Sequence, residues 1–587
     1  MSDFLNGNMV RDRSQFVVIL KVCLLSIVSR IKVPIVSSSW LMLISSIYIV
    51  SINNSLFWSK FYPLTSGNLA DKLFVCFSFA AFFVFVLYVL MSLFSVKGST
   101  RYVVSFLIIL SSVISYFMND YGTVISYSMV QNLVQTDVGE AFDLISVNLL
   151  LHVFIFGIVP CVFIWLIKLK PQSITDEFKN RAGVLFVLFV VTSSTVYFSI
   201  KDIAFIGREN RELRYYINPV FPIMSVYKYV KYLNKDKNNK LEEVYSDASL
   251  VTRLTDNGKK TVLVFVVGET ARSVSFNLNG YEKNTTPLLN KLSIISFSNT
   301  YSCGTATAES LPCMFSDVEH DNFNIKKIRH RENLLDALKY AGVDVLWREN
   351  DSGCKGVCNR SETEVMHVTA KSSLCHGDEC YDEVLLQGLS ERIKNIKNDT
   401  VIFLHQQGSH GPAYYKRTPE KFRKFQPECT SKALQECSNQ EITNSYDNTI
   451  LYTDYFLAKV IDVLKSESET VNTAMIYMSD HGESLGESGL YLHGLPYFMA
   501  PDEQIKIPFI MWLSPDIQET KSISEACLAS NSHNAYSHDN LVHSVMGLMD
   551  VKSKVYNKQL DVFSDCRRND KISVAGSAEE IKINKKS

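Results

Sequence analysis

The stretch KKTVLVFVVGET, residues 259–270, decides the fold class of the larger, C-terminal part of the chain. It is a run of β-branched and other apolar residues that ends in Gly-Glu, which is typical of a parallel strand buried on both faces. The same pattern recurs in VDVLWREN (343–350), DTVIFLHQQGSH (399–410) and VNTAMIYMSDHGES (471–484). Helical patterns such as ENLLDALKYAG (332–342) separate these runs. We therefore predict an α/β domain with a mostly parallel sheet between helices, and a site beyond the carboxyl ends of its strands.

The first 200 residues have a different composition, dominated by apolar runs that approach the roughly 20 residues needed to cross a bilayer. Five spans are expected, near 34–54, 73–94, 102–117, 149–167 and 183–200. The run at 16–28, interrupted by Lys21, is expected to lie at the membrane surface. The predicted organisation is a transmembrane domain (1–200), a membrane-surface connector (201–258), a catalytic domain (259–566) and a charged, disordered tail (567–587).

Basic residues in the short loops predict the orientation. Lys and Arg precede the first span, and they also occur in the loop between the second and third spans and in the loop between the fourth and fifth. The connection between the third and fourth spans, residues 118–148, contains neither. The N-terminus is thus expected in the cytoplasm and the C-terminal domain outside, with no cleaved signal peptide. The 59 Lys and Arg against 60 Asp and Glu offer no argument for nucleic-acid binding.

Cysteine usage agrees with an exported domain. Ten of the 13 cysteines lie after residue 300, and most of them form close pairs in sequence. These pairs are Cys303/Cys313, Cys354/Cys358, Cys375/Cys380 and Cys429/Cys437, with Cys527 and Cys566 as a fifth candidate. Disulfides are favoured over zinc binding, because the C-x₃-C and C-x₄-C spacings lack a matching second pair.

Metal-binding residue types follow three of the predicted strands. Glu269 ends the first, His410 follows the third, and Asp480 and His481 end the fourth. A lone Glu in such a place is usually a cap, but convergence at one sheet edge favours a Zn²⁺ site. The segment YSCGTATAESLPC (301–313) offers Thr305 and Thr307 as nucleophiles that a metal could activate.

Several longer stretches together resemble one family. They are VVGETARSVSFNLNGY (266–281), SCGTATAESLPCMFS (302–316), DSGCKGV (351–357), HQQGSHGPAYYKR (405–417) and SDHGESLGESGLYLHG (479–494). On these motifs, and along most of its length, the chain resembles the lipid A phosphoethanolamine transferases, the family that includes polymyxin-resistance enzymes. The resemblance implies five spans, a bridging segment and a sulfatase-like domain of the alkaline phosphatase superfamily.

The resemblance also implies roles for individual residues. The family's zinc ligands fall on Glu269, Asp480 and His481, and its nucleophile, a further ligand, falls on Thr307 rather than Thr305. The residues at which a second metal or the phosphate would bind are His410 and His493. The substrate-binding residues of the family match Ser352, Lys355, Asn132, Thr136 and Glu140. The last three are spaced at i, i+4 and i+8, which predicts one helical face. The pair His538-Asp539 also matches a family stretch and is interpreted as structural.

The implied reaction moves phosphoethanolamine from phosphatidylethanolamine to Thr307, and then to a phosphate of lipid A. The same resemblance implies one or two Zn²⁺ ions, a bacterial inner-membrane location with a periplasmic catalytic domain, and a monomeric state. It also implies that the reaction lowers the negative charge of the cell surface and gives polymyxin resistance. Three alternatives stay open: a core-sugar or glucan acceptor, a glycerol-phosphate transferase, and a catalytically silent binding protein. A sulfatase is disfavoured because its C-x-P-x-R signature is missing.

Overall fold

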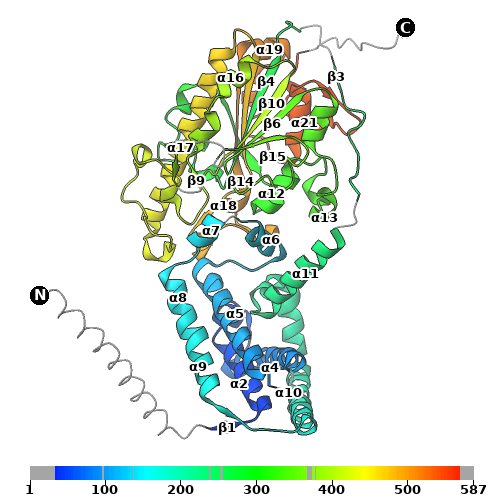
Figure 1. Ribbon diagram of the computed structural model, residues 1–587, viewed down its shortest axis with the longest axis vertical. Coiled ribbons are helices and arrows are strands. Elements are labelled where there is room, and N and C mark those ends of the chain that lie inside the picture. Colours follow the sequence, from blue (N-terminus) through cyan, green and yellow to red (C-terminus); the bar gives the residue numbers. More distant parts are fainter. Residues whose placement is uncertain are drawn as a thin grey trace, which may run out of the picture. The chain divides into compact units, whose positions relative to one another are not determined.

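The computed structural model describes residues 34–95, 98–136, 138–236, 240–251, 256–366, 373–376 and 379–568 (Figure 1). The predicted surface segment 16–28 and all but the first two residues of the predicted tail lie outside the described residues. The chain divides into two compact units. The first contains Met1–Ser115 and Leu151–Leu213, and the second contains Tyr116–Leu150 and Arg214–Ser587.

The first unit is built from apolar helices. Their bounds are α2 Ser38–Ser51, α3 Ser55–Phe61, α4 Leu69–Phe94, α5 Thr100–Tyr121, α8 Val147–Val153, α9 Val159–Leu166 and α10 Ile174–Glu209, with α5 and α8 each running on from one unit into the other. A π-helical turn at Phe154–Ile158 joins α8 to α9. Short strands β1 (Ile35–Val36) and β2 (Lys168–Leu169) pair in parallel.

Four of these helical stretches are long and apolar enough to cross a membrane, and a fifth is obtained if the pair α2 and α3, bent by 57°, is one span. Each of the five predicted spans falls on one of them. The helix α10 is longer than expected, since it continues to Glu209 and passes the predicted boundary at residue 200. Polar side chains join the helices inside the unit: Ser78 Oγ on α4 lies 2.9 Å from Ser199 Oγ on α10.

The second unit contains an eight-stranded sheet in the order β15-β5-β14-β11-β4-β10-β6-β7. The bounds are β4 Thr261–Gly268, β5 Ile295–Tyr301, β6 Asp344–Glu349, β7 Glu362–Val365, β10 Thr400–His405, β11 Asn472–Ser479, β14 Lys506–Leu513 and β15 Tyr536–Ser537. Strand β14 alone is antiparallel to its neighbours. The four runs singled out in the sequence are the adjacent parallel strands β11, β4, β10 and β6, which confirms the predicted fold class.

Helices cover both faces of this sheet (Figure 1). Their bounds are α12 Thr307–Met314, α13 Ile325–Ile328, α14 Leu334–Tyr340, α16 Leu389–Lys394, α17 Asn439–Glu467, α18 Asp502–Ile505, α19 Pro515–Thr520, α20 Glu525–Ser530 and α21 Asp539–Leu548. Side chains of α12, α14 and α21 share one buried apolar cluster with the sheet, in which Phe265, Phe315 and Trp347 are fully buried. The long helix α17 contacts β11 and begins with a capping box formed by Ser438 and Glu441.

Smaller elements complete the second unit. They are α6 Tyr127–Gln135, α7 Val138–Asp143, α11 Val220–Asp236, β3 Ser249–Leu250, β8 Cys375–His376, β9 Glu379–Cys380, β12 Ser484–Leu485, β13 Tyr491–Leu492 and β16 Val551–Lys552. The helix α6 precedes the catalytic domain by more than 120 residues in the sequence, but it packs inside this unit. Gln131 Nε2 donates to the carbonyl oxygen of Ala308 at 2.9 Å. The segment between the third and fourth predicted spans is therefore part of the wall around α12.

Candidate active site

Two strand ends bring three of the predicted ligands together. Strands β4 and β11 are parallel neighbours, with Gly268 opposite Ser479. Glu269 follows the first strand, and Asp480 and His481 follow the second, so all three lie at the same edge of the sheet. Their side chains are fully buried. The His481 Nε2 atom lies 3.2 Å from Asp480 Oδ2 and 3.6 Å from Glu269 Oε1.

Thr307 is the first residue of α12 and reaches the same point. Its hydroxyl donates to Glu269, whose Oε2 and Oε1 lie at 3.2 and 3.3 Å, and Oγ1 is 3.4 Å from His481 Nε2. The alternative nucleophile, Thr305, is turned away, because its hydroxyl donates to the carbonyl oxygen of Leu495 at 2.5 Å. Thr307 therefore stands at a helix N-terminus, where free backbone N–H groups favour a phosphate.

The loop before α12 is held at both ends. A disulfide joins Cys303 to Cys313, across the loop that contains Thr307. His538 Nδ1 accepts from the backbone N–H of Cys303 at 3.1 Å, while Nε2 lies 2.9 Å from the carbonyl oxygen of Ser479. Burial lowers the pKa of His538 to about 4, so the neutral ring serves as acceptor at one nitrogen and donor at the other. His538 thus ties the segment before Thr307 to the end of β11.

The loop after β10 closes the site behind Glu269. Gly408 has a φ of +53°, and a Cβ atom at this position would lie 2.6 Å from the backbone oxygen of Glu269. The following N–H, of Ser409, donates to that same oxygen at 3.0 Å. Only glycine allows the loop to approach this closely, because a larger residue would be strained at this φ and would collide with the backbone of Glu269.

The donor set fits a divalent metal ion. Two buried carboxylates, a buried imidazole and a hydroxyl converge, and His481 Nε2 lies within 3.6 Å of an oxygen of each carboxylate. Burial, followed by the nearby Asp480 carboxylate, raises the pKa of Glu269 well above its usual value, and burial raises the pKa of Asp480 to about 6. Burial lowers the pKa of His481 to about 4, which keeps the imidazole in the neutral form that binds metals. A bound metal cation would therefore compensate the charge of the Glu269 and Asp480 carboxylates.

These pKa shifts predict how removal of the metal changes stability. Because the pKa of Glu269 is raised, the unfolded chain loses this proton at lower pH than the folded apo-protein does, so the apo-protein loses stability as pH rises above the ordinary carboxyl pKa. We expect EDTA to lower the melting temperature by about 2–4 °C more at pH 8 than at pH 6. Thermal denaturation with EDTA and with excess Zn²⁺ at both pH values measures this; an equal loss at both would contradict it.

His410 and His493 lie beside this centre. The ring of His493 is 4.3 Å from that of His481 and 5.7 Å from that of His410, between centroids. Burial lowers the pKa of His410 well below its usual value and that of His493 to about 4. The structure also adds a residue that the sequence reasoning missed. Glu483 Oε2 lies 2.8 Å from His493 Nδ1 and so orients this ring, and its Oε1 accepts from Tyr414 at 2.6 Å. Its only sequence signal was its place in the quoted motif SDHGES.

A second buried charge cluster, also missed, lies next to Glu269. Single ligand atoms of Glu269, Asp351 and His405 lie within 4.8 Å of one another, and His405 Nδ1 is 2.8 Å from Glu349 Oε1. Although burial alone lowers it, the Glu349 carboxylate raises the pKa of His405 to about 9. The Glu349 carboxylate thus favours the charged form of His405, whose Nε2 lies 3.9 Å from Asp351 Oδ2. Asp351 and His405 open two of the quoted motifs, which was the signal available.

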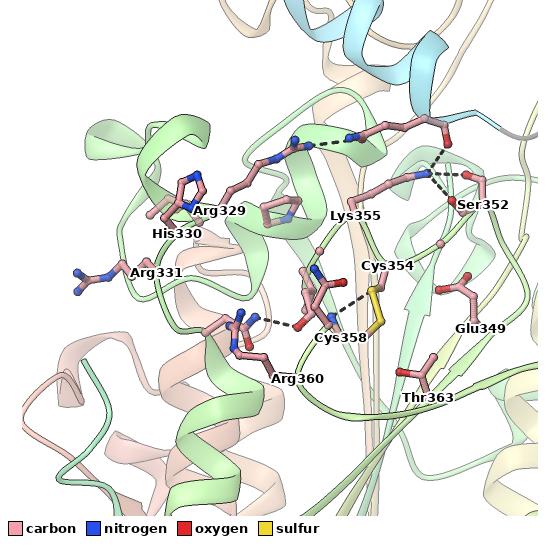
Figure 2. A pocket seen from close by; sticks show the side chains of 18 of the residues that line it. Arg329, His330, Arg331, Glu349, Ser352, Cys354, Lys355, Cys358, Arg360 and Thr363 are labelled. Carbon is pink, nitrogen blue, oxygen red and sulfur yellow. Dashed lines mark hydrogen bonds between the residues drawn. A yellow bond between two sulfur atoms is a disulfide. The ribbon is translucent and has the colours of Figure 1, made fainter. Parts of the chain in front are cut away.

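The predicted substrate residues fall into two groups. Lys355 and Ser352 contact each other, with Nζ donating to Ser352 Oγ at 2.7 Å and to its carbonyl oxygen at 2.9 Å (Figure 2). The single helical face predicted for Asn132, Thr136 and Glu140 is wrong. The helix α6 ends at Gln135, and Thr136 is its extended C-cap, bound to the Asn132 carbonyl oxygen through both N–H and hydroxyl at 2.8 Å. Glu140 lies in the next helix, α7, and its side chain is outside the described residues.

The five cysteine pairs named from the sequence are joined in the structure. The disulfides are Cys303–Cys313, Cys354–Cys358, Cys375–Cys380, Cys429–Cys437 and Cys527–Cys566. Two of them enclose predicted site residues, Thr307 within Cys303–Cys313 and Lys355 within Cys354–Cys358.

Comparison with known proteins agrees with this architecture. Residues 261–551 match the sulfatase family, and residues 83–233 match the family described as phosphoethanolamine transferase EptA/EptB. The chain is 36% identical to phosphoethanolamine transferase EptA of Escherichia coli K12 over 90% of its own length and 97% of that protein. It is 37% identical to phosphatidylethanolamine transferase Mcr-1 of Escherichia coli, covering 77% and 85% of the two chains.

A solved structure resembles the whole chain. The integral membrane lipooligosaccharide phosphoethanolamine transferase A of Neisseria meningitidis aligns with a TM-score of 0.86 and 33% identity, covering 91% of this chain and 100% of that one. Together, the apolar helices, the sulfatase-like sheet and the buried Thr307 site define a membrane protein that carries a group-transfer enzyme domain. The chain belongs to the phosphoethanolamine transferase family, as the sequence motifs predicted.

Proposed function

We propose that this enzyme transfers phosphoethanolamine from phosphatidylethanolamine to a phosphate of lipid A through a covalent intermediate on Thr307. The observation that carries the proposal is the position of Thr307. Thr307 begins a helix, lies within a disulfide loop and points at two buried carboxylates and an imidazole. Packing of the fold alone does not require a threonine with these contacts. The same setting suits a nucleophile that attacks phosphorus.

Two in-line displacements complete the reaction. In the first, the Thr307 Oγ1–P bond forms, the bond from phosphorus to the glycerol oxygen breaks, and diacylglycerol leaves with the proton that Thr307 gives up. In the second, a phosphate oxygen of the acceptor forms a bond to the same phosphorus, the Thr307 Oγ1–P bond breaks, and the Thr307 oxygen takes up the proton that the acceptor phosphate gives up. Positioning of the reacting groups contributes most of the rate in such transfers.

The chain's own residues orient these steps. Glu269 accepts a hydrogen bond from the Thr307 hydroxyl. This contact directs the lone pairs of the Thr307 oxygen away from the carboxylate. We assign the rings of His410 and His493 to binding the phosphoryl oxygens or a second metal ion, and Glu483 orients His493 through its contact with Nδ1. Ser352 and Lys355 are assigned to the phosphoethanolamine group, with Asn132, Thr136 and Glu140 on the membrane side.

Glu269, Thr307, Asp480 and His481 would hold Zn²⁺. When bound, it would acidify the threonine hydroxyl and stabilise the charge that develops on the phosphoryl oxygens.

The location follows from the lipid substrates. We propose that the protein resides as a monomer in the inner membrane, with its catalytic domain in the periplasm, where both lipids are within reach. Addition of ethanolamine masks negative charge on lipid A, which weakens the binding of cationic polymyxins to the cell surface.

Other relatives suggest a second acceptor. Relatives named Kdo(2)-lipid A phosphoethanolamine 7''-transferase are 26% identical to this chain, so another position on the same lipid is the second candidate. Analysis of lipid A from cells that express the chain distinguishes them, because phosphoethanolamine on Kdo or on a core sugar leaves the lipid A phosphates unmodified.

The covalent step is tested by intact mass spectrometry. Purified protein incubated with phosphatidylethanolamine and Zn²⁺ is expected to gain the mass of one phosphoethanolamine group, and peptide mapping is expected to place it on Thr307. Release of diacylglycerol without any adduct under single-turnover conditions would show direct transfer or hydrolysis, and would overturn the assignment of Thr307.

A further inference from the structure

Thr270, the residue after Glu269, has an unusual backbone conformation. Its φ is +59°, in the left-handed region, and its side chain is fully buried. This region is unfavourable for a β-branched residue because the Cβ atom is crowded against the backbone. A residue strained in this way persists only where the surrounding structure holds it, and such residues cluster at functional sites. The contacts that hold Thr270 are therefore informative.

The backbone around Thr270 is held by side chains of α17 and β11. The hydroxyl of Tyr446, on α17, donates to the Thr270 carbonyl oxygen at 2.7 Å and accepts from the N–H of Arg272 at 3.0 Å. The N–H of Ala271 donates to Ser479 Oγ, at the end of β11, at 2.8 Å. All of these groups are buried, so the strained conformation is fixed by tertiary contacts.

In this conformation Thr270 contacts both carboxylates of the candidate metal centre. Its hydroxyl donates to Glu269 Oε1 at 2.6 Å, and its N–H donates to Asp480 Oδ1 at 3.1 Å. Among the described residues, the bond to Glu269 is the only hydrogen bond of the Thr270 hydroxyl. One residue therefore holds one oxygen of each carboxylate, the first through its side chain and the second through its backbone.

The protein occupies the other outward-facing atoms of the centre and leaves two atoms available. Asp480 Oδ1 also accepts from the N–H of His481 at 2.7 Å, whereas the buried Oδ2 has no hydrogen-bond partner in the described part of the chain. His481 Nδ1 lies 2.9 Å from the carbonyl oxygen of Gly482, a contact in which Nδ1 is the donor and Nε2 keeps its lone pair. Asp480 Oδ2 and His481 Nε2 are thus left for a metal ion.

The spacing of the ligand atoms shows why the orientation of the carboxylates matters. Four tetrahedral ligands at about 2.0–2.2 Å from Zn²⁺ lie about 3.3–3.6 Å from one another. His481 Nε2 lies 3.2 Å from Asp480 Oδ2 and 3.4 Å from Thr307 Oγ1. It lies 3.6 Å from Glu269 Oε1. The terminal torsion of a carboxylate side chain is broad, so rotation of either carboxylate would disturb this spacing unless a contact prevents it.

We propose that Thr270 is a positioning residue of the metal centre, and that it orients the Glu269 carboxylate through its hydroxyl and the Asp480 carboxylate through its N–H. The inference rests on the Zn²⁺ of the proposed function and extends it to a residue outside the ligand set. Removal of groups that orient metal ligands typically weakens metal binding about 10- to 100-fold. Glycine would adopt the same φ without strain but would supply only the N–H, so the threonine side chain adds the hold on Glu269.

The test measures the Zn²⁺ affinity of the purified full-length protein by competition with a chromophoric chelator. Thr270→Val keeps the shape of the side chain but lacks the hydroxyl, and it is expected to bind Zn²⁺ about 10- to 100-fold more weakly. Thr270→Ser keeps the hydroxyl and is expected to bind within about threefold of wild type. With Co²⁺ in place of Zn²⁺, visible absorption reports the ligand arrangement. The spectrum of Thr270→Val should differ from that of wild type, and the spectrum of Thr270→Ser should match it.

Thr270→Gly separates the hydroxyl from the backbone. Glycine takes a φ of +59° without strain and keeps the N–H that Asp480 accepts, so this variant is expected to fold even where valine is not tolerated. It should bind Zn²⁺ more weakly than Thr270→Ser, because it lacks the contact with Glu269.

Thr285→Val is the matched control. Thr285 is a buried threonine of the same segment after β4, and its hydroxyl donates to the Ser275 carbonyl oxygen at 2.7 Å instead of a carboxylate. The same substitution here should leave the Zn²⁺ affinity and the Co²⁺ spectrum unchanged. Melting temperatures of the metal-free proteins establish that each variant is folded.

Each outcome decides the proposal. A folded Thr270→Val or Thr270→Gly variant with the Zn²⁺ affinity of wild type would overturn the role of Thr270. An equal loss of affinity in Thr285→Val would also overturn it, because any disturbance of the segment would then suffice. A wild type that binds no Zn²⁺ would instead overturn the proposed metal, and this inference with it.

Discussion

Thr307→Ala is expected to reduce phosphoethanolamine transfer by roughly 10⁴-fold or more, because in the proposed mechanism it removes the oxygen that attacks phosphorus and carries the intermediate. The substitution deletes a hydroxyl and a methyl group from a buried position, 3% exposed, without adding volume. The measurement is steady-state transfer to lipid A from labelled phosphatidylethanolamine, together with the intact mass of the variant, which should show no adduct.

Thr307→Ser and Thr305→Ala are the matched controls. Serine keeps the hydroxyl and should retain a measurable fraction of the rate. Thr305→Ala removes a threonine of the same loop whose hydroxyl is bound to Leu495 and not to the site, so it should still form the adduct. If Thr307→Ala transferred phosphoethanolamine within tenfold of wild type, Thr307 could not be the nucleophile.

Glu269→Gln has the second large effect that we expect, a loss of about 10³-fold in activity with loss of bound Zn²⁺. An amide of the same shape keeps the packing but supplies no negative charge to a cation, and metal contributes several kcal/mol to such transition states. Metal content by atomic absorption and transfer rate are measured on the same preparation.

The same substitution is expected to stabilise the metal-free protein at pH 8. Burial and Asp480 raise the pKa of Glu269, so ionisation of this group lowers the free energy of unfolding of the wild-type apo-protein. Glutamine is neutral at every pH and has no such effect. The two apo-proteins should therefore melt at similar temperatures at pH 5 and diverge as pH rises. A Glu269→Gln variant that is less stable than wild type at pH 8 without metal would show that the carboxylate is satisfied by protein contacts alone.

The order and type of the main elements could be predicted from local pattern. Strands β4, β6, β10 and β11 are apolar on both faces, and a run of that kind has few alternatives in a polar domain. The spans were similarly evident, because bilayer thickness imposes a length. Helix ends were less certain: α10 extends beyond its predicted boundary, since its last two turns mix polar and apolar residues that carry no membrane signal.

The site was predictable where function places unusual residue types at strand ends. Glu269, Asp480 and His481 follow buried strands, and the resemblance selected Thr307 over Thr305. The helical face proposed for Asn132, Thr136 and Glu140 failed, because periodicity does not reveal that the chain leaves the helix at Thr136. Glu483 and His405 were missed because their importance depends on which side chain lies across from them.

The sequence by itself determined the membrane part, the α/β class, the residue types at the strand ends that suit a metal ion, and the family. Only the tertiary structure decided that α6 lies against α12, that Glu349 pairs with His405, and that Arg329 and Lys355 line one pocket with Glu349. The physical reason is the distance along the chain over which each kind of interaction acts. Hydrophobic periodicity and turn preferences act over a few residues, whereas charge balance and pKa depend on groups that meet only after the chain has folded.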